Sequence, residues 1–131
     1  MAVNSAGNAY INNNGSVTLT GSNITVGSGD ILSLATSSGN IAINGNVGSG
    51  SSIGSIILNA ANAITETAGT LTATNVNLSS GAGSIGATGA GNAINTAATN
   101  LTVSSSANAY ISNAGSTSLN SSSAGSVTHL V

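Results

Sequence analysis

Only three side chains in this sequence, Asp30, Glu66 and His129, could titrate near neutral pH. Two carboxylates at a fixed separation hydrolyse glycosidic bonds when one of them has a raised pKa, so Asp30 with Glu66 is one candidate pair. His129, Asp30 and any of the many serines would supply the parts of a nucleophilic triad. However, β-helices that cleave polysaccharides generally gather several acids and a base in one cleft, and His129 lies close to the C-terminal end, where fraying is expected. We therefore expect two solvated carboxylates in turns or on faces, and no enzyme.

Two further kinds of motif combine glycine with groups that bind ions. The stretch 27–32 is similar to the calcium-binding nonapeptide of RTX solenoids, Gly-Gly-x-Gly-x-Asp, but it is one residue short and occurs once. We expect a β-turn before a strand there, and the sequence leaves open whether Asp30 binds an ion. The stretches 81–86 and 86–91 are rich in glycine like phosphate-binding loops, but no lysine follows them, so turns are expected. No spacing of His or acidic residues predicts a transition-metal site, and no cofactor is expected.

The composition argues against several classes of function. The 131 residues include no Lys, Arg, Cys, Pro, Trp or Phe, and the formal net charge is −2. Nucleic-acid binding depends on Lys and Arg beside phosphates, so no nucleic-acid partner is expected. The absence of Cys removes disulfides and thiolate metal ligands. Apolar residues make up 40% and the mean hydropathy is +0.33. Because so little charge guards against association, we expect the chain to be part of an assembly.

Neither a membrane span nor an export signal is visible in the sequence. The longest strongly apolar run, 56–58, is far shorter than the roughly 20 residues that a spanning helix needs, so the chain is not expected to span a membrane. Residues 1–5 lack the basic and apolar regions of a signal peptide. If the protein is exported, its signal is expected to lie outside these residues.

The tyrosines and several threonines are candidate contact residues. Tyr10 and Tyr110 are the only aromatic residues, and an outward-facing tyrosine could stack on a sugar. Because both occupy repeated positions, we expect them instead to pack on a neighbouring rung or subunit. The threonine runs 18–20 and 70–74 suggest a different class, the ice-binding solenoid, which needs a flat and regular threonine array. These threonines do not recur at one fixed coil position, so this class is not favoured.

One short module recurs along the chain and would position any of these residues. Asn is followed by an aliphatic, a small polar and a second aliphatic residue, and then by a Ser/Gly turn; copies begin at Asn23, Asn40, Asn75 and Asn100. Strict alternation of apolar and polar residues indicates a strand with one buried face. Asn-Gly and Ser-Gly pairs predict the turns between such strands, at 14–15, 38–39, 44–45 and 80–81.

A longer repeat links the two ends of the chain. Residues 3–20 and 103–120 align at an offset of 100 residues with ten identities in eighteen positions, and both tyrosines fall in this element. Apolar pairs also recur every seven to ten residues, so three strands would make a coil of about 20 residues and five coils would account for the offset. A fixed period is typical of a solenoid, whose repeats bury their apolar sides against each other. Frequent Gly and β-branched residues, without an i, i+3, i+4 stripe, exclude an α-solenoid.

We therefore predict a single all-β domain over residues 1–131, a right-handed parallel β-helix (β-solenoid) with about 20 residues per coil and six to seven coils. At about 4.8 Å per rung the rod would be roughly 30 Å long. Aligned Asn, Ser and Thr side chains are expected to form hydrogen-bonded ladders between rungs. The residues predicted to face inward are Val17, Leu19, Ile24, Val26, Leu32, Leu34, Ile41, Ile43, Ile56, Leu58, Ile64, Leu71, Val76, Leu78, Ile85, Ile94, Leu101, Val103, Ile111 and Leu119.

Four segments carry a family resemblance, namely 69–78, 83–86, 91–95 and 108–113. They resemble the repeats of filamentous-haemagglutinin-like exoproteins, the large bacterial surface adhesins exported by two-partner secretion. The resemblance covers most of the chain and implies a right-handed parallel β-helix outside a bacterial cell, serving as a shaft or adhesive fibre. The Asn-Pro motif of the family's secretion domain is absent. The match is therefore to the repeat shaft, and it carries neither an export route nor a receptor-binding residue to this chain.

The expected function is that of a non-catalytic extracellular fibre or adhesin shaft. Neither terminus carries a polar helix or a charged cap, and an open strand edge tends to pair with another strand. Because the two ends repeat one another, the last rung of one chain could accept the first rung of the next, which gives a filament. The expected partner is thus the same chain, head to tail, or the rest of a longer repeat array. The alternative is an adhesin module that recognises glycans or a cell surface through an outward ladder.

Overall fold

The computed structural model describes residues 1–21, 23–50, 52–89, 91–125 and 128–130. Over these ranges the chain forms strands and turns without a helix, and every strand pair is parallel. The strands are β1 (Val3–Asn4), β2 (Ala9–Asn14), β3 (Val17–Leu19), β4 (Ile24–Thr25), β5 (Ile31–Ser38), β6 (Ile41–Asn44), β7 (Ser55–Ala60), β8 (Ile64–Ala68), β9 (Leu71–Ser80), β10 (Ile94–Ser105), β11 (Ala109–Asn113), β12 (Ser118–Ser123) and β13 (Thr128–Leu130).

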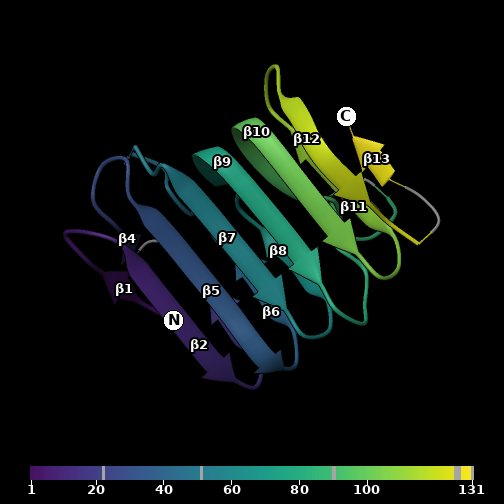
Figure 1. Ribbon diagram of the computed structural model, residues 1–131, viewed down its shortest axis with the longest axis horizontal. Coiled ribbons are helices and arrows are strands. Elements are labelled where there is room, and N and C mark those ends of the chain that lie inside the picture. The colour runs from purple at the N-terminus through teal and green to yellow at the C-terminus, as the bar shows by residue number, and fades with distance from the viewer. Residues whose placement is uncertain (22, 51, 90, 126–127, 131) are drawn as a thin grey trace.

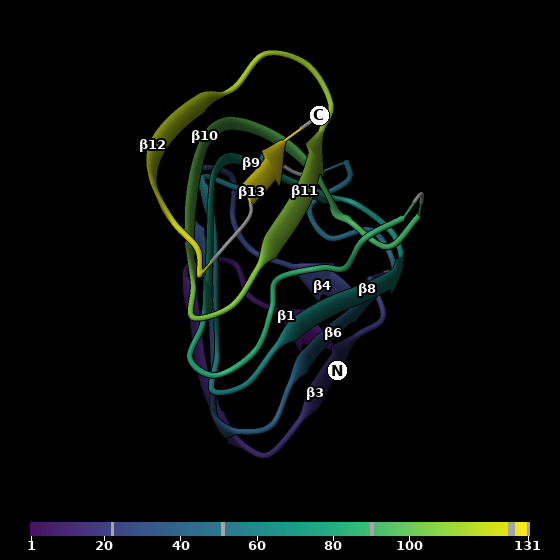
Figure 2. The same cartoon turned by 90° about the vertical axis from the view of Figure 1, so that its right-hand side faces the viewer.

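The chain winds around three sides of a β-solenoid (Figure 2). The front side is formed by β2, β5, β7, the later parts of β9 and β10, and β12, side by side in that order (Figure 1). The second side contains β3, β6 and β8 and continues through Ile85 and the start of β11 to β13. The third side contains β1 and β4, then Val47 and the beginnings of β9 and β10. Each turn of the solenoid thus visits the front, second and third sides in order.

The solenoid has about five turns of about 23 residues each. This confirms the predicted all-β solenoid, although its turns are longer and fewer than the six or seven coils of about 20 residues that were expected. On the front side, Ala9, Leu32, Ile56, Val76 and Leu101 stack in one column. The spacing of apolar pairs underestimates the turn because the corners between strands contain glycine and polar residues that form no apolar pair.

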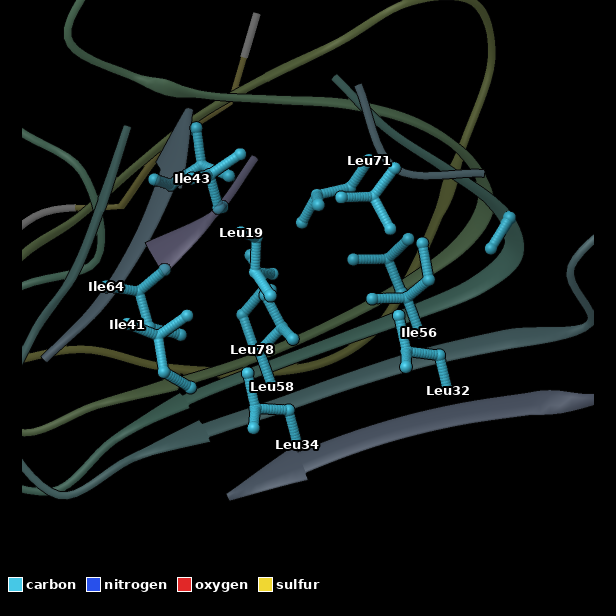
Figure 3. Close-up of a cluster of buried hydrophobic side chains, with 14 of the residues drawn as sticks. Leu19, Leu32, Leu34, Ile41, Ile43, Ile56, Leu58, Ile64, Leu71 and Leu78 are labelled. Atoms are coloured by element: carbon cyan, nitrogen blue, oxygen red, sulfur yellow. The ribbon is translucent and has the colours of Figure 1, made fainter. Parts of the chain in front are cut away.

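Columns of aliphatic side chains fill the interior (Figure 3). Leu34, Leu58 and Leu78 are stacked on the front side, and Ile41 and Ile64 face them from the second side. All five are buried. Because side chains alternate between the two faces of a strand, the alternating pattern places every second residue in this core. Burying one such side chain fully contributes about 1.5–3 kcal/mol.

Leu119 is the one predicted inward residue that is exposed, with 43% of its surface accessible. Its register is inward as predicted, since it pairs with the buried Leu101. However, β12 is the last front strand in the described part of the chain, and no further rung covers Leu119 there. Conversely, Val47 and Ile53 are buried without having been predicted. They are single aliphatic residues among Gly and Ser, so no alternating pattern marks them.

Three glycines are stacked at one corner of the solenoid. Gly21, Gly45 and Gly69 follow each other at intervals of 24 residues and lie one above the other. A Cβ on Gly45 would meet the carbonyl oxygen of Thr20 and the Cα of Gly21, and a Cβ on Gly69 would meet the backbone of Gly45. Any larger residue in this column would separate the rungs, because there is space only for hydrogen.

The two copies of the repeated element lie on different sides of the solenoid. Val3 belongs to β1 on the third side, whereas Val103 belongs to β10 on the front side. Tyr10 lies in β2 on the front side, and Tyr110 lies in β11, beside Ile85 and β13 of the second side. An offset of 100 residues is about four and a third turns of about 23 residues. The expectation of five whole coils between the copies is therefore wrong, and the second copy lies one side further along.

One excursion interrupts the regular winding. After Ile85 the described residues 86–89 and 91–93 project from the stack, and the chain returns at the start of β10 (Figure 2). The Ala87 N–H donates to the Asn92 carbonyl at 2.9 Å, and the Asn92 N–H donates to the Gly89 carbonyl at 3.2 Å. The projecting loop is therefore held by hydrogen bonds of its own, as expected for turns rather than a phosphate-binding loop.

Candidate functional surface

The two acidic side chains lie on different elements and do not form a catalytic pair. Asp30 is half-buried in the turn directly before β5. Glu66 lies in β8 on the second side, where it pairs in register with the inward-facing Ile43. One carboxylate is thus in a surface turn and the other faces the interior, so they do not share the cleft that glycoside hydrolysis needs.

Glu66 is buried, with 8% of its surface accessible, so the expectation of a solvated position was wrong for this residue. The physical reason is strand alternation, which turns Glu66 to the same face as the buried Ile64. Its carboxylate contacts Asn95 in β10, just after the excursion. The Asn95 N–H donates to Oε2 at 2.9 Å, and the Asn95 side-chain amide donates to Oε1. Glu66 therefore replaces the backbone carbonyl that a neighbouring strand would offer to the start of β10.

The environment of Glu66 shifts its protonation equilibrium. Burial raises the pKa of the Glu66 carboxyl above 4.5, and the two hydrogen bonds from Asn95 lower it by less. Within the described residues, no buried side-chain nitrogen or oxygen is without a hydrogen-bond partner. Glu66 is accordingly a satisfied structural group that joins β8 to β10.

The arrangement does not assemble a triad from His129 and Asp30. His129 lies in β13, which is at the opposite end of the sheet order from β2 and β5, and its side chain lies outside the described part of the structure. Asp30 precedes β5 in the second turn. Across the described ranges, no group of three or more His, Asp or Glu side chains comes together to hold a metal ion.

The segment that is similar to a calcium-binding repeat forms a turn. The Asp30 N–H donates to the Gly27 carbonyl at 3.1 Å, which closes a β-turn. The Asp30 carbonyl accepts the N–H groups of Gly54 at 2.9 Å and Ser55 at 3.2 Å from the next rung. The predicted β-turn before a strand is confirmed, and its backbone groups hold two rungs together.

The front side presents ladders of amide and hydroxyl side chains. Asn100 donates through Nδ2 to Oδ1 of Asn75 at 3.0 Å, and Asn75 donates in turn to Ser55 Oγ at 3.3 Å. The Ser123 and Ser104 hydroxyls are 3.3 Å apart. The expected polar ladders between rungs are thus present, although each extends over two or three rungs and then changes residue type.

The tyrosines take different positions on this surface. Tyr10 projects from β2 with 68% of its surface accessible, and the same column continues through Ser33, Ile57, Asn77 and Thr102. Tyr110 is half-buried. Tyr10 therefore offers an exposed ring to a ligand or to another protein surface, whereas Tyr110 is partly covered by its neighbours.

The threonines form no continuous array. Thr18 and Thr65 share one outward column on the second side, but Ala42 lies between them. The run at 70–74 lies on the third side, where Thr72, Thr74 and Thr99 line an open hollow of about 320 Å³ together with Ser52, Ile53 and Ala73. The lining residues are uncharged, and Ile53 and Ala73 among them bear no hydroxyl, so the surface differs from the flat threonine array that ice binding needs.

No protein-family model, curated protein or solved structure matches this chain. In the part of the chain that the structure describes, no helix is long and apolar enough to cross a membrane.

Proposed function

We propose that this chain is a non-catalytic structural protein, the shaft of an extracellular bacterial surface fibre or adhesin, and that its solenoid is extended head to tail. The observation that carries the proposal is that an inward-facing core residue stays partly uncovered at each of the two open turns. At one end Leu119 is 43% exposed although it continues the buried column of Leu101. At the other end the inward-facing Ile11 is only partly buried.

The strands at the two open turns are of matching length. On the front side, β2 and β12 have six residues each, and on the second side β3 and β13 have three each. The outer edges of β2 and β12 have no partner strand in the described part of the chain. Unpaired edges recruit further strands unless charge opposes the addition. Neither β2 nor β12 carries a charged side chain, although β12 has one register shift against β10, between Leu101 and Thr102. The rungs that extend the stack come from a second copy or from the rest of a longer repeat array.

The near absence of charge supports the same function. With no Lys or Arg and two acidic side chains, rungs can approach without like charges meeting above and below. The resemblance to filamentous-haemagglutinin-like repeats, together with this neutral stack, supports a place outside a bacterial cell. A chain without Lys or Arg also has no site for proteases of trypsin specificity.

Electron microscopy of the purified chain tests the proposal. We expect unbranched fibres whose diffraction shows a rung spacing of about 4.8 Å. Leu119→Lys should block elongation, because it places a charge at the open end of the core. Asn59→Lys, on an exposed front position of β7, is the matched control and should leave the fibres intact. Well-dispersed monomers at high concentration would contradict head-to-tail extension.

A second candidate is an adhesin module that binds glycans or a cell surface. The observation that favours it is the exposed ring of Tyr10 on the front side, since aromatic rings stack on sugars. A glycan array with the unmodified chain and with Tyr10 and Tyr110 replaced separates the two functions. A pure shaft binds no glycan, whereas an adhesin module loses its signal in the variant.

A further inference from the structure

The two Asn-Gly pairs of the chain, at 14–15 and 44–45, lie in contrasting surroundings. An asparagine side chain is open to attack by the backbone nitrogen of the next residue, and glycine in that place has no Cβ to hinder the approach. Whether the reaction proceeds depends on what holds the attacking N–H and what polarises the side-chain carbonyl. The structure differs between the two pairs in both respects.

At the first pair the side-chain carbonyl is polarised by two hydroxyl groups. The Ser37 hydroxyl donates to Asn14 Oδ1 at 3.0 Å, and the Ser38 hydroxyl donates to the same oxygen at 3.4 Å. Donors aimed at a carbonyl oxygen stabilise the negative charge that grows on it when a nucleophile adds to the carbon. The next rung thus provides Asn14 with a simple oxyanion-stabilising pair.

The attacking group of the first pair is not engaged. In the described part of the chain, the Gly15 N–H donates no hydrogen bond. The Gly15 carbonyl is held by the Asn13 side-chain amide at 3.0 Å, which fixes the peptide that follows. Gly15 has φ +121°, and the environment around a Cβ placed there is open except for the distant Asn13 amide.

In the second pair, the attacking N–H group is held by a hydrogen bond. The Gly45 N–H donates to the Ala68 carbonyl of the next rung at 2.8 Å, so attack would break a hydrogen bond between rungs. Asn44 Oδ1 accepts one hydroxyl, that of Thr67, at 3.1 Å. Gly45 is also packed within the glycine column between Gly21 and Gly69, where a Cβ on Gly45 would overlap the Thr20 carbonyl oxygen.

We propose that Asn14–Gly15 is a site of spontaneous intramolecular modification in the folded chain, and that Asn44–Gly45 is protected. The Gly15 nitrogen loses its proton and adds to Asn14 Cγ, the bond from Cγ to the side-chain nitrogen breaks, and ammonia leaves with the proton. The product is a five-membered cyclic imide. Water then opens either imide carbonyl, which gives aspartate or isoaspartate at position 14. No oxidant or reductant is consumed, and the net change is amide plus water to carboxylate plus ammonium.

The product changes the character of the front side. Either product adds a carboxylate to the two acidic side chains in the sequence, and it places the new charge at the end of β2, the outermost strand of its sheet. A charge on an edge strand opposes the addition of a further strand. The modification is a chemical property of the turn and does not depend on the proposed shaft function.

The test is to incubate the intact folded chain at mildly alkaline pH and to map its peptic peptides by mass spectrometry with electron-based fragmentation. The Asn44–Gly45 pair in the same molecule is the internal control, so no variant has to fold. We expect position 14 to convert at least about tenfold faster than position 44, since attack at the latter costs a hydrogen bond. In urea the two rates should converge.

Two outcomes overturn the proposal. One is conversion at position 44 as fast as at position 14 in the folded chain; the other is slower conversion of position 14 in the folded chain than in urea. The role of the hydroxyls is tested with the Ser37→Ala, Ser38→Ala double variant, which should slow conversion at position 14 by about three- to tenfold. An unchanged rate, with an unchanged circular dichroism spectrum, would contradict that role.

Discussion

At the scale of single residues, Glu66 is a titratable side chain that the strand pattern buries in the interior. The alternation that correctly places Ile64 inside also places Glu66 inside, so the signal was present in the sequence. Because a lone carboxylate is usually solvated, alternation alone does not predict that it is buried. What the sequence could not reveal is the acceptor that this burial requires, because Asn95 lies 29 residues away and reaches Glu66 only after the excursion.

The buried position of Glu66 predicts a pH-dependent stability. Burial raises its pKa above 4.5 in the folded chain, so between 4.5 and the raised value the folded state keeps a proton that the unfolded state has released. The contribution of protonated Glu66 to the free energy of unfolding is therefore fully present below this window. It decreases as pH rises through the window, by at most about 1.4 kcal/mol per pH unit. Urea denaturation at a series of pH values measures this change.

The control for this prediction is Glu66→Gln. The glutamine oxygen still accepts the Asn95 N–H, but the side chain no longer titrates, so the fall in stability over the same pH range should disappear. A wild-type chain whose stability is constant or rises from pH 4.5 upward would show that Glu66 does not control it.

At the scale of elements, the alternating modules were sufficient to identify the strands and the core but not the length of a turn. The aliphatic columns on the front and second sides were predicted residue by residue, because alternation is a local property. The turn length also depends on the corners, and at one corner Gly21, Gly45 and Gly69 are stacked at intervals of 24 residues. This glycine interval was visible in the sequence and is a better measure of the period than the apolar pairs.

The repeat at an offset of 100 residues wrongly predicted five whole coils between its two copies, because sequence identity does not fix the position of a residue within a turn. Asn13 and Asn113 are equivalent in sequence but not in the fold. The Asn13 amide bonds to the Gly15 carbonyl, whereas the buried Asn113 also bonds to Thr96 at 2.8 Å and to the Ala98 N–H at 3.0 Å. A sequence copy in a solenoid keeps its place in the stack only when the offset is a whole number of turns.

The close approach of rungs at glycine corners predicts a large effect of one methyl group. Gly39 and Gly29 have similar φ values, +88° and +79°. A Cβ on Gly39 would lie 2.7 Å from the Ser16 backbone nitrogen, whereas a Cβ on Gly29 would meet nothing within 4 Å. Gly29→Ala should cost about 1–2 kcal/mol for the left-handed backbone alone. Gly39→Ala should cost about 1–3 kcal/mol more, because the rungs must also separate.

Urea denaturation of the two variants measures this difference, and the similar backbone angles make Gly29→Ala the matched control. Equal losses of stability would mean that the corner relaxes without cost and that the glycines are required for their backbone angle only.

At the scale of the whole molecule, the near absence of charge is a property of the stack rather than of any one site. On the inner rungs, the outward side chains of paired strands have neighbours in the rungs above and below at about 4.8 Å. A charge that recurred at one position of the repeat would therefore meet its own copy in the next rung. Ser, Thr and Asn avoid this repulsion and donate and accept hydrogen bonds along the stack, as Asn75 and Asn100 do. The composition that excludes most chemistry is thus the composition that a repeating stack needs.

This reasoning predicts that two lysines in adjacent rungs destabilise each other, while the same two charges further apart do not. Asn77 and Thr102 are neighbours in one outward column, and Ser33 lies three rungs from Thr102 in the same column. In the Asn77→Lys, Thr102→Lys double variant, denaturation should show an unfavourable coupling of about 0.2–1 kcal/mol beyond the sum of the single changes.

The Ser33→Lys, Thr102→Lys pair is the control. Its two positions are about 14 Å apart, beyond the Debye length of about 10 Å at 0.1 M salt, so the two changes in stability should be additive. In 1 M salt the coupling of the adjacent pair should vanish as well. Additive behaviour of the adjacent pair at low salt would mean that the rungs tolerate repeated charge, and that the composition needs a different explanation.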